Sequence, residues 1–235
     1  MRRLALCLIM LAPLAAAAQV YTYLDQSLRN GARAGTALMI APDVSVSEIS
    51  AGGVVEKMPD WSKQARENVS AALQRLGQGP GLRLAALPAL SAEEQHALEQ
   101  HVALYNVVAA NVHSNSVSGG ELWEKRLKSG LTDYTVGPGL AFLADRTGAG
   151  TALVVIARDA ESSGGRKAMF VLGAMFGVGI PLGQSFVVAG LVDLRTGRVL
   201  WQSFDRSVSS DLRVAADADK LVQGLFKSYP AAGEK

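Results

Sequence analysis

The chain has 235 residues, of which 49% are hydrophobic and 19% charged, a balance typical of a globular protein rather than a disordered one. A single domain is the expected count at this length. The formal net charge of +2 leaves no basic surplus to gather on one face, so nucleic acid is not an expected partner.

The first eighteen residues, MRRLALCLIMLAPLAAAA, have the layout of a secretory signal peptide: two arginines, an apolar run and then small residues. Ala16 and Ala18 satisfy the A-x-A cleavage rule, which predicts a mature chain that begins at Gln19. An uncleaved membrane anchor is the alternative, but the apolar run is shorter than the ~20 residues that span a bilayer. Residues 1–18 are therefore expected to direct export.

The single cysteine, Cys7, lies early in this segment, and most of the apolar run follows it. A lipoprotein signal places its cysteine after the apolar run, so a lipid anchor is not expected. Cleavage leaves residues 19–235 without cysteine, which excludes disulfides, thiol catalysis and thiolate metal ligands from that chain. It also removes Arg2 and Arg3, and the mature chain then has equal numbers of basic and acidic residues.

The first part of the mature chain alternates between helix and strand patterns. The predicted elements are a short helix over 20–30, a strand over 36–42, a hairpin or edge excursion over 44–59, a helix from Asp60 to Gly77, and a strand over 82–88. The run TALMIAP is apolar without interruption, which indicates a strand covered on both faces. Asp60 is expected to cap the second helix.

Ser91 and Glu94 have the capping-box spacing S-x-x-E, which predicts the start of a long helix. The polar residues HSNSVSGG, at 113–120, predict a linker after it. The later predicted elements are a short amphipathic helix or turn over 121–128, a helix within 136–148, a strand over 151–159, two strands within 185–205, and a helix near 217–227. This order predicts an α/β domain that leans towards α+β: a three-layer sandwich with a mixed sheet, a late β-hairpin and a C-terminal helix.

The stretch LVDLRTGRVLWQS, residues 191–203, has two strand-like runs around a short polar turn. Gly197 can adopt the positive φ that a tight hairpin needs, and Asp193 and Thr196 can accept hydrogen bonds from the turn amides. Trp201 is expected to pack against the sheet. The pattern therefore predicts a structural hairpin rather than a chemical site.

The same stretch resembles the strand, D-x-x-T-G, strand hairpin of a group of bacterial envelope proteins. The group includes the curli secretion channel protein, the outer-membrane activators of penicillin-binding proteins, and the amino-terminal domain of the Tol-system propeller protein. LADRTGAGTALVVIARD, at 143–159, is similar to the helix, turn and buried strand that precede this hairpin, although Gly150 stands where the group commonly has aspartate. Within this broad group, residues 133–204 resemble uncharacterised exported proteins of Gram-negative bacteria.

The resemblance implies a three-layer α/β domain that works in assembly of the cell envelope, in the periplasm, without a catalytic centre. Most members of the group are lipoproteins, whereas this chain lacks the lipid-attachment cysteine. This departure argues against a lipid anchor in the outer membrane.

No motif for catalysis or for a cofactor is complete in the sequence. GVGIPLG, at 177–183, is followed by a strand pattern instead of the helix that a phosphate-binding loop requires. His96 and His101 are five residues apart, not the four that place a metal pair on one helix face, and His113 lies in the polar segment. Ser185 lacks the G-x-S-x-G context of a hydrolase nucleophile. The sequence therefore predicts no enzyme, no cofactor and no metal site.

Residues 168–192 contain no charged side chain, and four glycines lie within 168–183. The glycine-rich part, 168–183, has two interpretations: a packed apolar helix followed by a turn, or an exposed apolar surface for a membrane or another subunit. A spanning helix is disfavoured because a proline interrupts the run and a strand pattern follows. The candidate interaction residues are Met169, Phe170, Met175, Phe176 and Ile180.

Two functions remain after these exclusions. The first is an exported, non-enzymatic envelope protein, an assembly or accessory component that contacts an envelope protein, a second copy of itself or a membrane surface. The alternative is a periplasmic small-molecule-binding module. It would use the cleft at the carboxyl ends of the strands, near Asp43 and Arg158, where open α/β sheets bind ligands.

Overall fold

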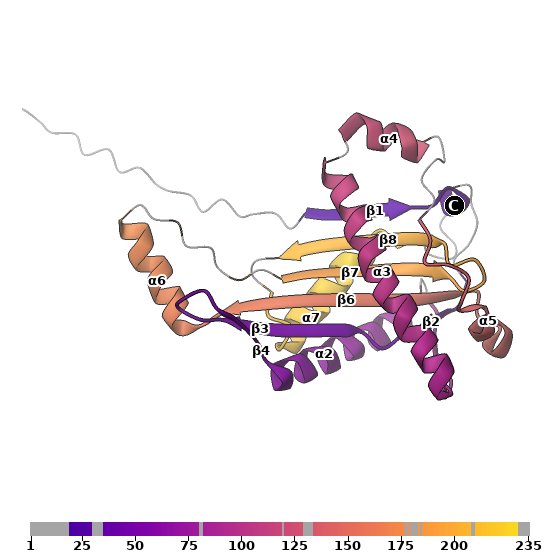
Figure 1. Ribbon diagram of the computed structural model, residues 1–235, viewed down its shortest axis with the longest axis horizontal. Coiled ribbons are helices and arrows are strands. Elements are labelled where there is room, and N and C mark those ends of the chain that lie inside the picture. Colours follow the sequence, from indigo (N-terminus) through magenta and orange to yellow (C-terminus); the bar gives the residue numbers. More distant parts are fainter. Residues whose placement is uncertain are drawn as a thin grey trace, which may run out of the picture.

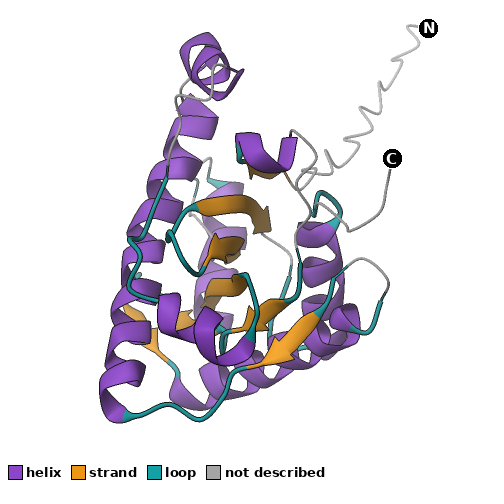
Figure 2. Cartoon of the chain, turned by 90° about the vertical axis from the view of Figure 1, so that its right-hand side faces the viewer, coloured by secondary structure: helices purple, strands orange, loops and turns teal. Residues whose placement is uncertain are grey.

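The computed structural model describes residues 19–29, 35–79, 82–118, 120–128, 134–176, 179, 183, 185–207 and 210–229. Within these residues, an eight-stranded mixed sheet lies between helices that pack on its two faces (Figures 1 and 2). The α/β class predicted from the sequence is confirmed, including the three layers, the mixed sheet, the late hairpin and the C-terminal helix.

The sheet has the strand order β1-β8-β7-β6-β2-β5, and β3, paired with β4, lies beside the outer half of β6. The strands are β1 (Gln19–Leu24), β2 (Ala37–Met39), β3 (Asp43–Ile49), β4 (Val55–Lys57), β5 (Leu84–Ala86), β6 (Thr151–Ser162), β7 (Ser185–Asp193) and β8 (Val199–Ser207). Strands β2 and β3 run parallel to β6, and β5 runs parallel to β2. The pairs β1–β8, β7–β8, β6–β7 and β3–β4 are antiparallel.

Helix α3 crosses one face of the sheet, and α2 and α7 cover the other face (Figure 1). The helices are α1 (Gln26–Arg29), α2 (Pro59–Gly77), α3 (Ala92–Ser118), α4 (Gly120–Lys128), α5 (Ala141–Thr147), α6 (Gly164–Met175) and α7 (Ala215–Phe226). Two hydrophobic cores result, one on each side of the sheet.

Strand β6 belongs to both cores. Its residues 151–157 are all buried; Leu153 and Val155 face α2 and α7, while Val154 and Ile156 face α3. A strand covered on both faces needs apolar side chains in both directions, which explains the unbroken apolar run TALVVIA.

A buried polar contact holds α3 on the sheet. The hydroxyl of Tyr105 donates to Gln202 Oε1 of β8 at 3.3 Å, and Gln202 Nε2 donates to the carbonyl oxygen of Ala109 at 3.2 Å. Gly190 of β7 leaves room for the ring, since a Cβ there would lie 1.8 Å from the Tyr105 hydroxyl oxygen. Complete burial raises the pKa of Tyr105 far above its usual range, so the phenol stays a hydrogen-bond donor.

The prediction of a helix over residues 20–30 is wrong for its first half. Residues Gln19–Leu24 form β1, which pairs antiparallel with β8, and only Gln26–Arg29 is helical. Between them Asp25 accepts hydrogen bonds from Ser27 N at 2.8 Å and from Arg198 Nη2 at 2.9 Å. Strand β8 provides the backbone hydrogen-bond partners of β1, and pairing with this sequence-distant strand overrides the local helical pattern.

Two predicted helix boundaries also change. Residues 113–118, predicted to be a polar linker, are helical and continue α3. Asn115 Nδ2 donates to Asn111 Oδ1 at 2.8 Å, a polar contact one turn apart that supports the helix here. Helix α2 begins at Pro59 without a side-chain cap, and Asp60 lies in its first turn instead of at the N-cap position.

The predicted capping box at the start of α3 is confirmed. Ser91 N donates to Glu94 Oε2 at 2.8 Å, and Glu94 N donates to Ser91 Oγ at 3.2 Å. Arg146 Nη1 donates to the same carboxylate at 2.8 Å. These bonds hold the pKa of Glu94 below its ordinary value.

The turn between β7 and β8 has the features of a structural hairpin. Asp193 Oδ1 accepts from Arg195 N at 3.0 Å, from Thr196 N at 2.7 Å and from Thr196 Oγ1 at 2.8 Å. Gly197 has φ +70°, and Trp201 is fully buried, with its Nε1 donating to the Ser228 carbonyl oxygen at 3.1 Å. Each of these groups therefore has a structural role in the turn or in the packing of β8.

We predict that Gly197→Ala destabilises the protein by about 3 kcal/mol or more, because it combines left-handed strain with a steric clash. A Cβ at this position would lie 1.9 Å from the Gly137 carbonyl oxygen. Gly148→Ala is the matched control, since Gly148 also has φ +71° but has open space around it, and should cost only about 1–2 kcal/mol. Chemical denaturation measures both; equal losses would contradict the clash.

Candidate functional site

Helix α6 leaves the body of the protein at the carboxyl end of β6 (Figure 1). Ser163 lies between the two elements; its amide donates to the Ile49 carbonyl oxygen at 2.9 Å, and its Oγ accepts from Arg166 N at 3.2 Å as the helix cap. None of the residues of α6 is buried. The helix is therefore fixed at its start and stands in solvent along its length.

From Met169 onward, the large side chains that α6 exposes are all apolar. Their exposed fractions run from 39% at Phe170 to 81% at Phe176, just after the helix. The exposed large apolar residues are Met169, Phe170, Val171, Leu172, Met175 and Phe176. Because successive helical residues point about 100° apart, the four consecutive residues from Met169 leave no polar face. We call residues 168–176 the apolar tip.

The structure shows that the described part of the apolar segment, as far as residue 176, is exposed rather than packed in the core. The predicted interaction residues Met169, Phe170, Met175 and Phe176 are exposed, whereas Ile180 lies outside the described residues. A surface helix of a soluble domain normally buries one apolar stripe, and exposed apolar patches are typical of contact sites. That these residues make a contact stays a prediction.

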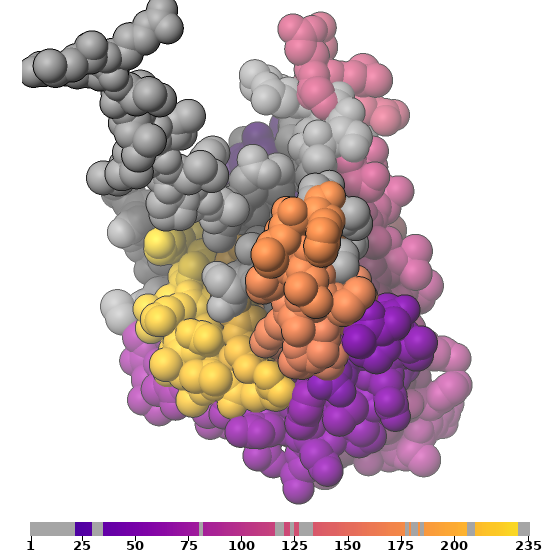
Figure 3. Space-filling model, turned by 90° about the vertical axis from the view of Figure 1, so that its left-hand side faces the viewer, coloured from indigo at the N-terminus to yellow at the C-terminus, as the bar shows by residue number. Residues whose placement is uncertain are grey.

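The β3–β4 hairpin lies against the base of α6, and Figure 3 shows the two side by side. A Cβ on Gly165 would stand 3.2 Å from the Ala51 methyl carbon, and one on Gly53 would stand 3.4 Å from Arg166 Nη1. Val54 and Val55 of this hairpin are also exposed. The apolar tip therefore has further apolar side chains near its base.

A group of carboxylates also lies at this end of β6. Oxygen atoms of Asp159, Glu161 and Asp211 lie within 4.8 Å of one another, the spacing of possible metal ligands. Arg213 already contacts two of them, with Nη2 2.7 Å from Asp211 Oδ2 and 3.8 Å from Glu161 Oε2. The buried Asp159 accepts from Leu212 N at 3.2 Å. The group is therefore an ion-pair network, organised around one guanidinium.

No sequence pattern predicted this network, because Asp211 and Arg213 lie about fifty residues beyond Asp159 and Glu161. The Arg213 guanidinium also lies over the Trp61 ring, 4.1 Å from its centroid, so the network ties the loop before α7 to α2. Burial, together with the neighbouring charges of Asp159 and Asp211, raises the pKa of Glu161 above its ordinary value.

We predict that Glu161→Gln stabilises the protein at pH 7 and has no effect at about pH 3.5. A carboxyl whose folded pKa is raised favours folding below its unfolded pKa of 4.5, and this contribution is lost as the pH rises through the folded pKa. Glutamine does not ionise, so the variant keeps this stability as the pH rises. Urea midpoints at the two pH values measure the difference, with the exposed Glu67→Gln as control; a destabilised variant at pH 7 would contradict the assignment.

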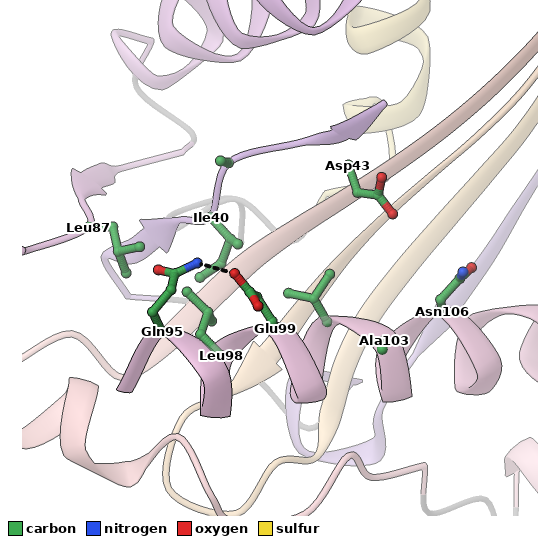
Figure 4. A pocket seen from close by; sticks show the side chains of 10 residues that line it. Ile40, Asp43, Leu87, Gln95, Leu98, Glu99, Ala103 and Asn106 are labelled. Carbon is green, nitrogen blue, oxygen red and sulfur yellow. Dashed lines mark hydrogen bonds between the residues drawn. The ribbon is translucent and has the colours of Figure 1, made fainter. Parts of the chain in front are cut away.

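A second candidate site is a pocket of about 400 Å³ under the N-terminal half of α3, where β2 and β5 end (Figure 4). Its lining residues are Ile40, Ala41, Asp43, Leu87, Gln95, Leu98, Glu99, Val102, Ala103 and Asn106. Gln95 Nε2 donates to Glu99 Oε1 at 2.8 Å on the helix side. The walls combine aliphatic side chains with two carboxylates and two amides.

The structure brings together Asp43 and Arg158, the pair named for the alternative function. Arg158 Nη2 lies 2.5 Å from Asp43 Oδ2, and Nη1 donates to the backbone oxygens of Asp43 at 2.8 Å and of Ala157 at 2.9 Å. Asp43 lines the pocket, but Arg158 does not. The arginine therefore positions the carboxylate without facing a ligand.

The three histidines have partners within the protein. His96 Nε2 pairs with Gln100 Nε2 at 2.9 Å, and His101 Nδ1 with the Ala97 carbonyl oxygen at 2.7 Å. The His113 ring stacks on Phe204 at a centroid distance of 3.6 Å. Most of the loop 177–183, and the side chain of Ser185, lie outside the described residues.

Of the helices that the structure describes, none combines the length and the hydrophobicity needed to cross a membrane. No protein-family model matches the sequence, and no curated protein matches it.

Among solved structures, the chain is similar to the PelC dodecamer from Paraburkholderia phytofirmans, with 15% identity and a TM-score of 0.38 over 92% of this chain and 99% of that chain. A point variant of the same dodecamer, in another crystal form, gives 13% identity and a TM-score of 0.37 over the same shares. Similarity at these TM-scores carries no conclusion about the fold or the function of this chain.

Proposed function

We propose that this protein is an exported, non-enzymatic component of the cell envelope, an accessory or assembly factor that works through contact at the apolar tip. The observation that carries the proposal is a helix fixed at one end of the sheet, without a buried residue and apolar on all sides from Met169 onward. The layout of residues 1–18 and the resemblance to envelope proteins support export to the periplasm.

Energetics support a role for the tip outside the fold itself. Fully burying an aromatic or aliphatic side chain stabilises a protein by about 1.5–3 kcal/mol, and no residue of α6 is fully buried in the described structure. Elsewhere in the described chain, most large apolar side chains are buried in the two cores. A contact that covers the tip would recover the burial that folding leaves unused.

We predict that the double variant Phe170→Asp/Phe176→Asp moves the protein from the envelope fraction to the soluble fraction of gently lysed cells. Its melting temperature should stay within about 2 °C of the wild type, because surface changes away from the core cost within about 0.5 kcal/mol. Fractionation followed by immunoblotting measures the distribution.

The matched control is Leu104→Asp/Val107→Asp on α3, which places two charges on side chains that are likewise exposed but lie away from the tip. This control should remain in the envelope fraction. Equal distributions for all three proteins would refute contact at the tip.

A small-molecule-binding module is the second candidate function, and the pocket beside Asp43 favours it. A volume of about 400 Å³ is within the range of sites for small organic ligands. The carboxylates of Asp43 and Glu99 would recognise amine or hydroxyl groups, and Ile40, Leu87 and Leu98 would contact an apolar body.

We predict for this candidate that a hydroxylated or amine-bearing ligand raises the melting temperature of the wild type but not of Ala103→Trp. The indole would fill the pocket from an exposed position on α3, so the variant itself should melt normally. A thermal-shift screen measures stabilisation by mass action. A ligand that stabilises both proteins equally binds elsewhere and would count against the pocket.

A further inference from the structure

The apolar tip lacks the polar face that a helix needs to lie on a flat protein surface. The exposed residues from Met169 to Leu172 point in four directions around the axis, and Met175 and Phe176 extend the apolar surface past the last turn. A partner that covers one side would leave the others in water. The occupant must therefore surround the helix.

The size of α6 argues against pairing with a second copy through this helix alone. Twelve residues give a helix of about 18 Å in length and about 10 Å in width, so one side offers a footprint of about 180 Å². A stable protein interface buries about 800 Å² on each partner. An interface between two tips falls well short of that area.

A lipid leaflet matches the tip in length and in its distribution of charge. The nine residues 168–176 extend about 13 Å along the axis, close to the ~15 Å of one leaflet's hydrocarbon layer. The only charged residues of α6 are Arg166 and Lys167, both in its first turn. With the tip in hydrocarbon, these cations would lie at the depth of the phosphate groups.

The carboxylates near the base of α6 limit how much anionic lipid contributes to the free energy of membrane binding. The charge of Lys167 acts on both Glu161 and Asp211, so part of it is already compensated within the protein. Hydrophobic insertion is then the main contribution, and attraction to anionic headgroups is a smaller one.

We propose that α6 inserts into one leaflet of a phospholipid membrane, with residues 168–176 among the acyl chains and Arg166 and Lys167 at the headgroups. This inference rests on the proposed contact function and names its partner. The β3–β4 hairpin, with exposed Val54 and Val55, lies near the interface in this arrangement. Insertion to this depth holds the protein on one side of the membrane without spanning it.

A single environment-sensitive label tests insertion directly. Cys7 is the only native cysteine, so Phe176→Cys in a Cys7→Ser background carries one labelling site whether or not residues 1–18 have been removed. The protein, purified after export and labelled with nitrobenzoxadiazole, is mixed with vesicles of phosphatidylethanolamine and phosphatidylglycerol at 3:1. We expect a blue shift and quenching by nitroxides on the acyl chains, but not by aqueous iodide.

Two controls make the result specific. The same label at Val107→Cys, an exposed position on α3, should show no shift. Adding Leu172→Asp to the labelled Phe176→Cys protein should lower vesicle binding at least tenfold, whereas Arg166→Gln/Lys167→Gln should lower it about twofold to fivefold, and only with anionic lipid.

A label at residue 176 that stays accessible to iodide with vesicles would overturn the lipid proposal. If Phe170→Asp/Phe176→Asp still leaves the envelope fraction in cells, the contact function survives and the occupant is a protein. A blue shift that depends on protein concentration without vesicles identifies a second copy and also overturns the proposal. The contact function itself is overturned if vesicles cause no blue shift and Phe170→Asp/Phe176→Asp also stays in the envelope fraction.

Discussion

The architecture depends on the burial of β6 on both faces. Its first seven residues are enclosed between α3 on one side and α2 with α7 on the other, and they connect the two cores. The strand is longer than the region that α3 crosses, and its outer half pairs with β3 and ends at Ser162 (Figure 1). The position and isolation of α6 follow from where this strand ends.

Both candidate sites lie where a layer of the sandwich stops. The pocket forms where the short β5 ends beside β2 and α3 continues above it, so its walls come from already rigid elements. The apolar tip forms beyond the last residue of β6, where no element of the described chain covers it. A rigid site suits selection of a small ligand, and a projecting helix suits attachment to a surface.

Local patterns predicted those elements whose stability is local or whose burial is two-sided. The apolar runs at 36–42 and 151–159 contain β2 and most of β6, and the Ser91–Glu94 box predicted α3. Strand β1 was not predicted because its hydrogen-bond partner, β8, is distant in the sequence. The sequence does not predict whether the tip is exposed, because an all-apolar helix has the same residue pattern whether it is packed or exposed.

Cysteine accessibility in intact cells tests most directly whether the tip is covered where the protein works. In a Cys7→Ser background, Met175→Cys and Val107→Cys, both strongly exposed, should react equally fast with a small maleimide in purified protein. In intact cells, contact at the tip predicts that Met175→Cys is protected at least tenfold while Val107→Cys reacts as before. Equal reactivity of the two positions in cells would contradict the account.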